Sequence, residues 1–333
     1  DLLEDPKLAK GLVKRDVIRV VTPGTVLAGT SLDETKNNYL MCVVYTGSDF
    51  GMSIVDVTTG EYLTTDLKDI SEIRDELFRF SPSEIIANEY LQMSGLNIEE
   101  LRNRIGFAYS TLSNKYFDDI TCYKAMCKHF HVANLTPLGI DAFPNGIIAS
   151  GALLQYLYET QKNEMPQLTS IKPYTTGKYM ILDTATRRNL ELTETMREKQ
   201  KRGTLLWVLD KSKTAMGARR VRYFIEQPLV DKAEIIKRLD AVEELNERLM
   251  DRDELREYLN PIYDLERLLA RISYRNASPR DLIAFKTSLE MLPPIKDLIK
   301  TFGCDAIKEA YEAMDCLEDL YKLIDDAIVD DPP

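Results

Sequence analysis

The chain has 333 residues, which is enough for about two domains if a typical domain has about 150 residues. Hydrophobic residues make up 44% and charged residues 29%, a balance that is typical of globular proteins and excludes a disordered chain. Lys and Arg number 43 against 54 Asp and Glu, and the net charge of −11 disfavours non-specific binding to a phosphate backbone.

Neither the apolar stretches nor the cysteines point to export or to a membrane. The longest apolar stretches, residues 39–45 and 147–157, are too short or too interrupted to span a bilayer, and no charged-then-apolar leader opens the chain. The cysteines are too few and too scattered for a disulfide framework and indicate free thiols in a reducing compartment. They are Cys42, Cys122, Cys127, Cys304 and Cys316. We therefore expect a cytoplasmic protein without membrane contact.

The first half of the chain mixes short β-type runs with helical patterns. It opens on Asp1 without Met, and Asp5-Pro6 predicts a cap with proline at the first helical position, so residues 7–14 read as a helix end or a linker. Both chain ends are expected to continue into a longer polypeptide. The predicted strands are 17–22, 39–45, 52–57, 61–65 and 84–87, and the predicted helices are 70–80 and 147–161. Strands flanked by helices predict an α/β first domain with a mixed sheet.

After about residue 178 the apolar spacing becomes helical almost throughout. Apolar residues recur at three-and-four spacing over 235–249, 262–272 and 317–328. Asp231 with Glu234 has the spacing of a capping box, and Ser278-Pro279 predicts a cap followed by proline at the first helical position. The second half is predicted to be an α-helical array with long helices.

Charge is uneven along this helical array. Residues 187–223 hold 11 basic and 4 acidic residues, whereas residues 300–333 hold 3 lysines and 10 acidic residues. The plain interpretation is two helical regions that complement each other or face different neighbours. DNA contact by the basic segment is the alternative, although Trp207 and Tyr223 are its only aromatic residues, too few for a stacking platform.

Two sequence patterns imitate ligand sites without completing them. The stretch from Gly24 to Ser31 resembles a phosphate loop but lacks its lysine, so we interpret it as an ordinary loop. Cys122, Cys127, His129 and His131 place four candidate metal ligands within ten residues. On a helix they would project from opposite sides and could not converge on one zinc ion, so no metal site is predicted. The histidines also lack a nucleophile partner.

The carboxylates near the 58–60 turn are the one candidate for catalysis. Asp56, Glu61 and Asp66, with Asp69 nearby, could belong to a metal-dependent nuclease of the ribonuclease H type, although acidic residues beside a hairpin usually occupy solvated turn positions. Elsewhere, the charged run Asp264, Glu266, Arg267 and Arg271 is expected to form surface pairs on a helix. Arg187, Arg188 and Asn189 are expected to have a structural role where the sheet domain gives way to helices. We assign no catalytic, cofactor-binding or metal-binding residue.

Several stretches, taken together and in this order, resemble the MutS family of bacterial DNA mismatch-recognition proteins. They cover most of the chain, and the strongest match is Leu182-Asp183-Thr184-Ala185-Thr186-Arg187-Arg188-Asn189-Leu190-Glu191-Leu192. The others are Lys14-Arg15 through Pro23-Gly24-Thr25, Asp56-Val57-Thr58-Thr59-Gly60-Glu61, Tyr156-Leu157 to Lys162, Leu205 to Asp210, Thr214-Ala215-Met216-Gly217-Ala218-Arg219, Pro228-Leu229, Asp264-Leu265-Glu266-Arg267 and Pro279-Arg280-Asp281-Leu282.

The resemblance implies a domain plan. Residues 1–14 would be a linker from a mismatch-binding domain, residues 15–178 a connector domain with a ribonuclease-H-like fold and no nuclease activity, and residues 179–333 the first portion of the helical core, or lever, domain. The family's mismatch-binding domain, DNA clamp and C-terminal ATPase have no counterpart here. The chain is therefore expected to be a non-catalytic piece that binds no cofactor, with ATP and Mg²⁺ bound only by the full-length protein.

The resemblance also implies partners. The connector would dock MutL and help relay the nucleotide state, and the lever helices would couple the ATPase to the DNA-holding regions. Mismatched DNA and a second subunit would be partners of the full-length protein, in the bacterial cytoplasm at the nucleoid. The polar, helix-like stretch 121–131 is the candidate MutL-contacting segment, through Lys124, Lys128 and His129. A ribonuclease-H-type nuclease and a stand-alone nucleic-acid-binding module remain the alternatives.

Overall fold

A computed structural model describes residues 17, 19–26, 32–182 and 184–332. By their contacts these residues form two units. The α/β unit comprises the described residues up to 26 together with 38–174, and the helical unit comprises 32–37 together with the described residues from 175 onward. The short segment 32–37 therefore belongs with helices that follow it by well over a hundred residues.

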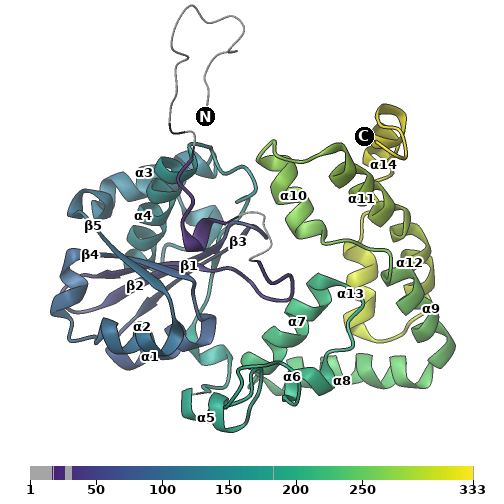
Figure 1. Ribbon diagram of the computed structural model, residues 1–333, viewed down its shortest axis with the longest axis horizontal. Helices are drawn as coiled ribbons and strands as arrows, with labels where there is room; N and C mark the ends of the chain where they lie inside the picture. Colours follow the sequence, from purple (N-terminus) through teal and green to yellow (C-terminus); the bar gives the residue numbers. More distant parts are fainter. Residues whose placement is uncertain (1–16, 18, 27–31, 183, 333) are drawn as a thin grey trace, which may run out of the picture. The chain divides into compact units, whose positions relative to one another are not determined.

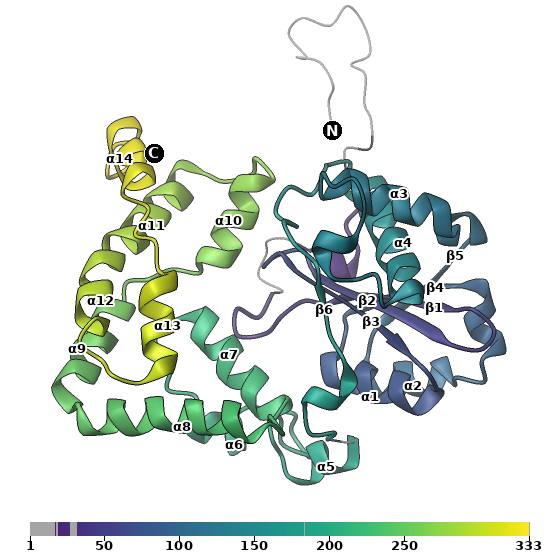
Figure 2. The same ribbon diagram turned by 180° about the vertical axis from the view of Figure 1, so that it is seen from behind.

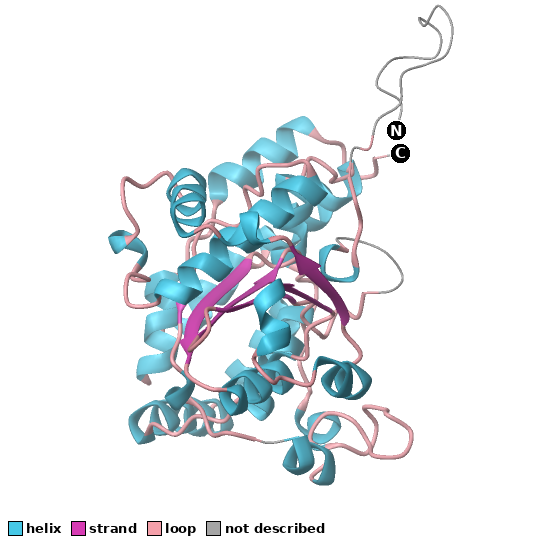
Figure 3. Ribbon diagram, turned by 90° about the vertical axis from the view of Figure 1, so that its left-hand side faces the viewer, coloured by secondary structure: helices cyan, strands magenta, loops and turns pink. Residues whose placement is uncertain are grey.

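The α/β unit is built on one six-stranded mixed sheet, as predicted (Figures 1 and 3). Its strands lie in the order β5-β4-β1-β2-β3-β6. The first three strands form an antiparallel meander, while β4 is parallel to β1, β5 to β4 and β6 to β3. The strands are β1 (Leu40–Tyr45), β2 (Phe50–Asp56), β3 (Glu61–Leu67), β4 (Glu84–Asn88), β5 (Ala108–Leu112) and β6 (Lys172–Pro173).

Helices cover both faces of this sheet, so the central strands are buried on both sides. In Figure 1, α1 (Ile70–Phe80) and α2 (Ile98–Ile105) lie below the sheet, and α3 (Asp119–His129) and α4 (Pro144–Gln161) lie above it. Because side chains alternate along a strand, Met41 and Val43 point to the same side of the sheet. They belong to the core cluster between the sheet and α1, together with Ile73 and Leu77 of α1. Short 3-10 turns occur at Pro23–Thr25 (η1), Glu89–Met93 (η2), Asn114–Phe117 (η3) and Thr136–Leu138 (η4).

The backbone of helix α4 approaches the backbone of the sheet closely at Gly51. A side chain at Gly51 of β2 would collide with the backbone of Asn145, and one at Gly151 would collide with Cys122 of α3. The hydroxyl of Tyr62 donates to the carbonyl of Ser150 at 2.7 Å, inside the same interface. These glycines let α4 serve as the helix that joins the sheet to α3.

Local signals in the sequence locate most elements of this unit. The predicted helix 70–80 is confirmed at both ends: Asp69 accepts from the amides of Ser71 and Glu72, and Ser81 ends the helix in the left-handed region with φ of 44°. The strand predicted at 17–22 is wrong for the residues described there. Val20 instead donates its amide to the carbonyl of Thr160, at the end of α4. The predicted helix end at 7–14 lies outside the described residues.

The helical unit is an array of short helices, which confirms the helical prediction and corrects the expected lengths (Figure 2). The longest helix has 16 residues, because capped breaks divide the apolar pattern; Asp231 and Ser278 are N-caps, as predicted. The helices are α5 (Thr184–Asn189), α6 (Leu205–Leu209), α7 (Ala215–Glu226), α8 (Lys232–Glu247), α9 (Leu249–Leu259), α10 (Leu265–Ser273), α11 (Pro279–Glu290), α12 (Leu292–Ile299), α13 (Asp305–Ala313) and α14 (Glu318–Ala327). A turn, η5 (Thr176–Lys178), precedes them.

The apolar core of the helical unit is divided among small clusters. One gathers around Ile262 and Phe302, a second around Leu206, and a third around Phe285, where α14 packs against α11. The helix α8 has no buried residue. No helix in the described ranges is long and apolar enough to cross a membrane.

Candidate docking face and buried arginine network

The predicted docking helix exists as α3, and its two lysines face solvent. Asp118 caps the helix by accepting from the amide of Thr121 at 2.9 Å. Cys122 and Met126 are fully buried and fix the inner side of α3. Lys124 and Lys128 are exposed and lie one turn apart, so they share the outer side.

His129, the third predicted docking residue, is half-buried and has both ring nitrogens engaged. Nε2 lies 2.7 Å from the carbonyl oxygen of Leu168, and Nδ1 lies 2.6 Å from the hydroxyl of Tyr158. A carbonyl can only accept, so we assign the proton to Nε2 and let Nδ1 accept from the Tyr158 hydroxyl. Burial lowers the pKa of His129 and favours this neutral form. The structure therefore places His129 inside the unit and only the two lysines on its surface.

The four clustered cysteines and histidines do not converge. Cys122 is buried between α3 and α4, and His131 follows the helix in the left-handed region with φ of 54°. Burial raises the pKa of Cys122 to about 12 and that of Cys42, on the central strand, well above its usual range. Across the described ranges, no group of three or more His, Cys, Asp and Glu side chains could hold a metal ion.

The carboxylates considered for a nuclease are each occupied by local structure. Asp56 is fully buried and accepts from the amide of Asn38 at 3.1 Å and from the amide and hydroxyl of Thr58 at 2.8 and 2.6 Å. Glu61 accepts from the hydroxyl of Tyr39 at 2.7 Å. Asp66 accepts from two amides that begin α4, and burial raises its pKa. These contacts explain the acidic residues as turn and cap groups, so the structure gives the nuclease alternative no support.

The imitation phosphate loop also has a structural role in its described part. The amide of Gly24 donates to the carboxylate of Glu84 at 2.9 Å, and a side chain at Gly24 would collide with Leu40. An acidic residue at this amide is the opposite of what a phosphate site requires. The rest of the stretch, 27–31, lies outside the described residues.

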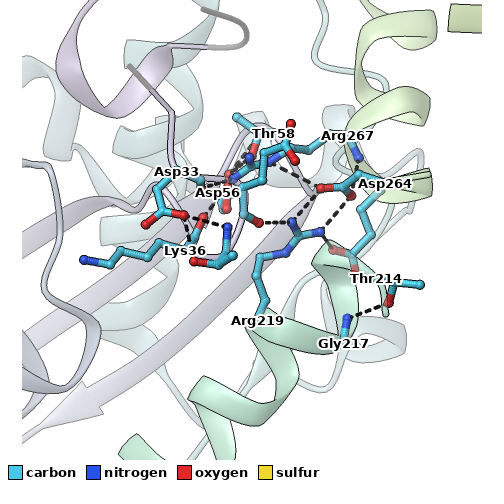
Figure 4. A network of polar contacts seen from close by, with 12 residues as sticks. Asp33, Lys36, Asp56, Thr58, Thr214, Gly217, Arg219, Asp264 and Arg267 are labelled. Atoms are coloured by element: carbon cyan, nitrogen blue, oxygen red, sulfur yellow. Dashed lines mark hydrogen bonds and ion pairs between the residues drawn. The ribbon is translucent and has the colours of Figure 1, made fainter. Parts of the chain in front are cut away.

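Two of the four residues of the charged run that begins α10, Asp264 and Arg267, are largely buried, which corrects the expected surface pairing for them. Arg219 of α7 forks the carboxylate of Asp264 at 2.6 and 2.8 Å, and its second nitrogen also reaches Glu266 at 2.5 Å (Figure 4). The side chains of Arg219, Asp264 and Arg267 are only 5%, 12% and 9% exposed. Arg271 behaves differently, because it pairs with Asp281 at a partly exposed position.

This arginine network also holds the segment that precedes β1. Arg267 donates through one nitrogen to the carbonyls of Asp33 and Lys36, at 3.2 and 2.8 Å, and Arg219 donates to the carbonyl of Glu34 at 2.8 Å. At the edge of the contact, the ammonium of Lys36 lies 2.9 Å from Glu194. Sequence spacing could not reveal these contacts, because the donors follow the acceptors by more than 180 residues.

The basic segment 187–223 divides between interior and surface. Arg187 donates to the carbonyls of Leu182 and Glu226, and Arg222 pairs with the Glu226 carboxylate, whose pKa burial raises against the opposing effect of both arginines. Four of the 11 basic residues are at least partly buried: Arg187, Lys201, Arg219 and Arg222. The other seven are exposed: Arg188, Arg197, Lys199, Arg202, Lys211, Lys213 and Arg220. The expected structural role is therefore seen for Arg187, while much of the segment faces solvent.

Comparison with known proteins identifies both units. Residues 38–169 match the family profile described as MutS domain II, and residues 185–333 match the one described as MutS domain III. The chain belongs to the MutS family. Curated relatives named "DNA mismatch repair protein MutS" include those of Lachnoclostridium phytofermentans, Acetivibrio thermocellus and Ruminiclostridium cellulolyticum, which are 54%, 46% and 45% identical over 99% of this chain. The chain spans 36%, 38% and 38% of their respective lengths.

Proposed function

We propose that this chain serves a MutS-type mismatch-repair protein as a non-catalytic connector and lever. Residues 15–178 form the connector in this proposal and residues 179–333 the first portion of the lever domain. The observation that carries the proposal is the outer side of α3. Buried Cys122 and Met126 hold the helix in place, and its outer side presents cations to solvent, where a partner with acidic groups can contact them.

The α3 face combines positive charge with exposed apolar surface. Lys124 and Lys128 are exposed, and although Lys124 interacts electrostatically with Asp118, both ammonium groups can reach an acidic partner. Ile120 is 61% exposed and Tyr123 is 37% exposed on the same helix. Apolar side chains beside exposed cations favour a protein partner.

The helical unit supports the lever role through its construction. Short capped helices joined by a buried polar network can move as rigid pieces and pass on a displacement. Acting this way, the unit would relay the nucleotide state of the full-length protein. In that protein, ATP with Mg²⁺, mismatched DNA and a second subunit would be bound by regions outside this chain. Five free cysteines agree with the reducing bacterial cytoplasm, at the nucleoid, as the place of action.

Binding to the purified N-terminal half of MutL, measured by biolayer interferometry at moderate salt, tests the docking proposal. We expect saturable binding at micromolar concentration and a loss of about tenfold or more in affinity for the double variant Lys124→Glu/Lys128→Glu. The matched control is Lys68→Glu/Arg102→Glu, which makes the same charge change at exposed positions near α1 and on α2. Absence of binding, or an equal loss in the control, would contradict the proposal.

Because seven cations of the basic segment are exposed, nucleic-acid binding is a second candidate function of the chain. Lys201 already pairs with Asp210 at 2.5 Å, and the adjacent exposed cations are opposed by the net charge of the chain. We expect substitution of Lys199, Lys201 and Arg202 by Gln to leave residual duplex affinity nearly unchanged. A marked drop in affinity and in its salt dependence would favour the nucleic-acid-binding module instead.

A further inference from the structure

The helical unit recognises residues 32–37 through their backbone. Three carbonyl oxygens, those of Asp33, Glu34 and Lys36, accept from the guanidinium groups of Arg219 and Arg267. Charge-assisted hydrogen bonds of this kind are stronger than those between neutral groups. The donors come from α7 and from the first turn of α10, so the segment is held by two helices of the unit (Figure 4).

The segment has no apolar anchor of its own. None of residues 32–37 is buried, and Asp33 and Glu34 are exposed. The Asp33 carboxylate accepts from the amide and hydroxyl of Thr35, at 2.8 and 2.7 Å, so it shapes the turn from within. The contacts seen between the segment and the two arginines are therefore carbonyl contacts, beside the exposed Lys36–Glu194 pair and the electrostatic attraction between Asp33 and Arg222.

The arginines remain compensated when the segment leaves. Arg219 keeps the forked contact with Asp264 and the contact with Glu266, and Arg267 keeps Asp264 within 3.8 Å. Opening therefore uncovers polar donors to water and leaves no buried charge without a counter-charge. The two donor arginines are therefore held in place by Asp264 and Glu266 whether or not the segment is bound.

We propose that Arg219 and Arg267 form a reversible clamp for a backbone turn, occupied here by residues 33–36. With the clamp closed, the chain leaves the helical unit at Asn37 and enters the α/β unit at Asn38, whose amide bonds Asp56. With the clamp open, residues 32–37 become a loop whose nearest described neighbours in the sequence, on both sides, belong to the α/β unit, and the covalent connection between the units remains where residue 174 is followed by residue 175. The clamp thus decides whether this loop attaches to the helical unit, and it does not depend on the proposed docking partner.

Amide hydrogen exchange of the whole chain, followed by mass spectrometry on peptides covering residues 32–38, tests the clamp. Arg267→Met keeps the aliphatic stem and removes both carbonyl contacts, and we expect exchange in this peptide to become about tenfold faster or more. The matched control is Arg271→Met, one turn later on α10, which removes the Asp281 ion pair and touches no carbonyl of the segment. It should leave the peptide unchanged.

Exchange in α7 and α10 separates clamp opening from loss of structure. If those helices exchange at the wild-type rate in Arg267→Met and the segment is no faster than wild type, the clamp proposal is wrong. If α10 itself is loosened, Arg267→Lys decides, because it keeps the charge but replaces the planar fork by a single ammonium group. Segment exchange about threefold faster with intact helices supports the clamp, and wild-type exchange overturns it.

Discussion

The two units are stabilised in different ways. In the α/β unit, 16 buried apolar residues on one side of the sheet form a single cluster, and α3 and α4 bury the other side. In the helical unit, the described clusters contain three or four buried residues each, and α8 buries none. Since burial of apolar area is the main stabilising contribution, the helical unit depends more heavily on its polar contacts.

Charged side chains bind backbone groups in both units, but the described arginine contacts to distant carbonyls lie in the helical unit. Asp56, Asp66 and Asp69 accept from backbone amides and so fix turns and helix starts in the α/β unit. In the helical unit, Arg187, Arg219 and Arg267 donate to backbone carbonyls. The comparison shows that both units use acids as backbone acceptors, at Asp69 and at Asp231 for example, and that the helical array adds long basic side chains that join distant segments.

The largest expected effect is in the sheet core. Ile54→Ala removes a fully buried side chain from β2 and should lower the free energy of unfolding of the α/β unit by about 4 kcal/mol. Ile262→Ala, at 8% exposure in a small cluster, should lower that of the helical unit by only about 2 kcal/mol. Native-state hydrogen exchange measured separately for each unit checks both values. Equal losses would mean that the two cores are alike.

A smaller loss is expected from the arginine network. Arg219→Met leaves Asp264 largely buried without its fork and should cost the helical unit about 2 kcal/mol, reduced because Glu266 is half-exposed. Lys201→Met removes a more exposed pair with Asp210 and should cost less than about 1 kcal/mol. Urea unfolding monitored by exchange in α7 measures the difference. Similar costs for the two variants would show that the buried arginine network contributes no more to stability than an exposed ion pair does.

The smallest expected effect is a pH dependence confined to the α/β unit, which contains both histidines. The pKa of His129 is lowered below its usual 6.5, so the unfolded chain takes up the proton first as pH falls. Stability contributed by neutral His129 is therefore present above pH 6.5 and lost as pH falls through the folded-state pKa. Urea midpoints at pH 7.5 and 5.5 should differ less in His129→Gln. An unchanged dependence would show that His129 does not contribute to it.

Prediction from sequence succeeded where structure is decided within a few residues. The predicted helix 70–80 matches α1, and the predicted cap at Ser278-Pro279 begins α11. It failed where distant contacts decide. Residues 17–22 have strand-like composition, yet Val20 bonds the end of α4. The edge strand β5 is only partly buried and has no continuous apolar pattern, so the sequence does not predict it.

The candidate site shows the same limit. The helix α3 could be predicted from a polar, helix-like stretch, but the hydrogen bonds of His129 depend on Tyr158 and Leu168, far along the chain. The run at Asp264 was interpreted as surface pairs because three-residue spacing is visible in a sequence. Arg219, which pairs with Asp264, precedes it by 45 residues, and nothing in the sequence around Arg219 indicates that the two residues are partners.

The buried thiol of Cys42 gives the central strand a built-in chemical probe. It lies on β1 with no exposed surface and a strongly raised pKa, whereas Cys127 and Cys316 are partly exposed. A thiol-labelling reagent should therefore modify the latter two in the native protein and reach Cys42 only when the sheet opens. The labelling rate of the Cys42 sulfur then reports the rate at which the sheet of the α/β unit opens, and no engineered label site is needed.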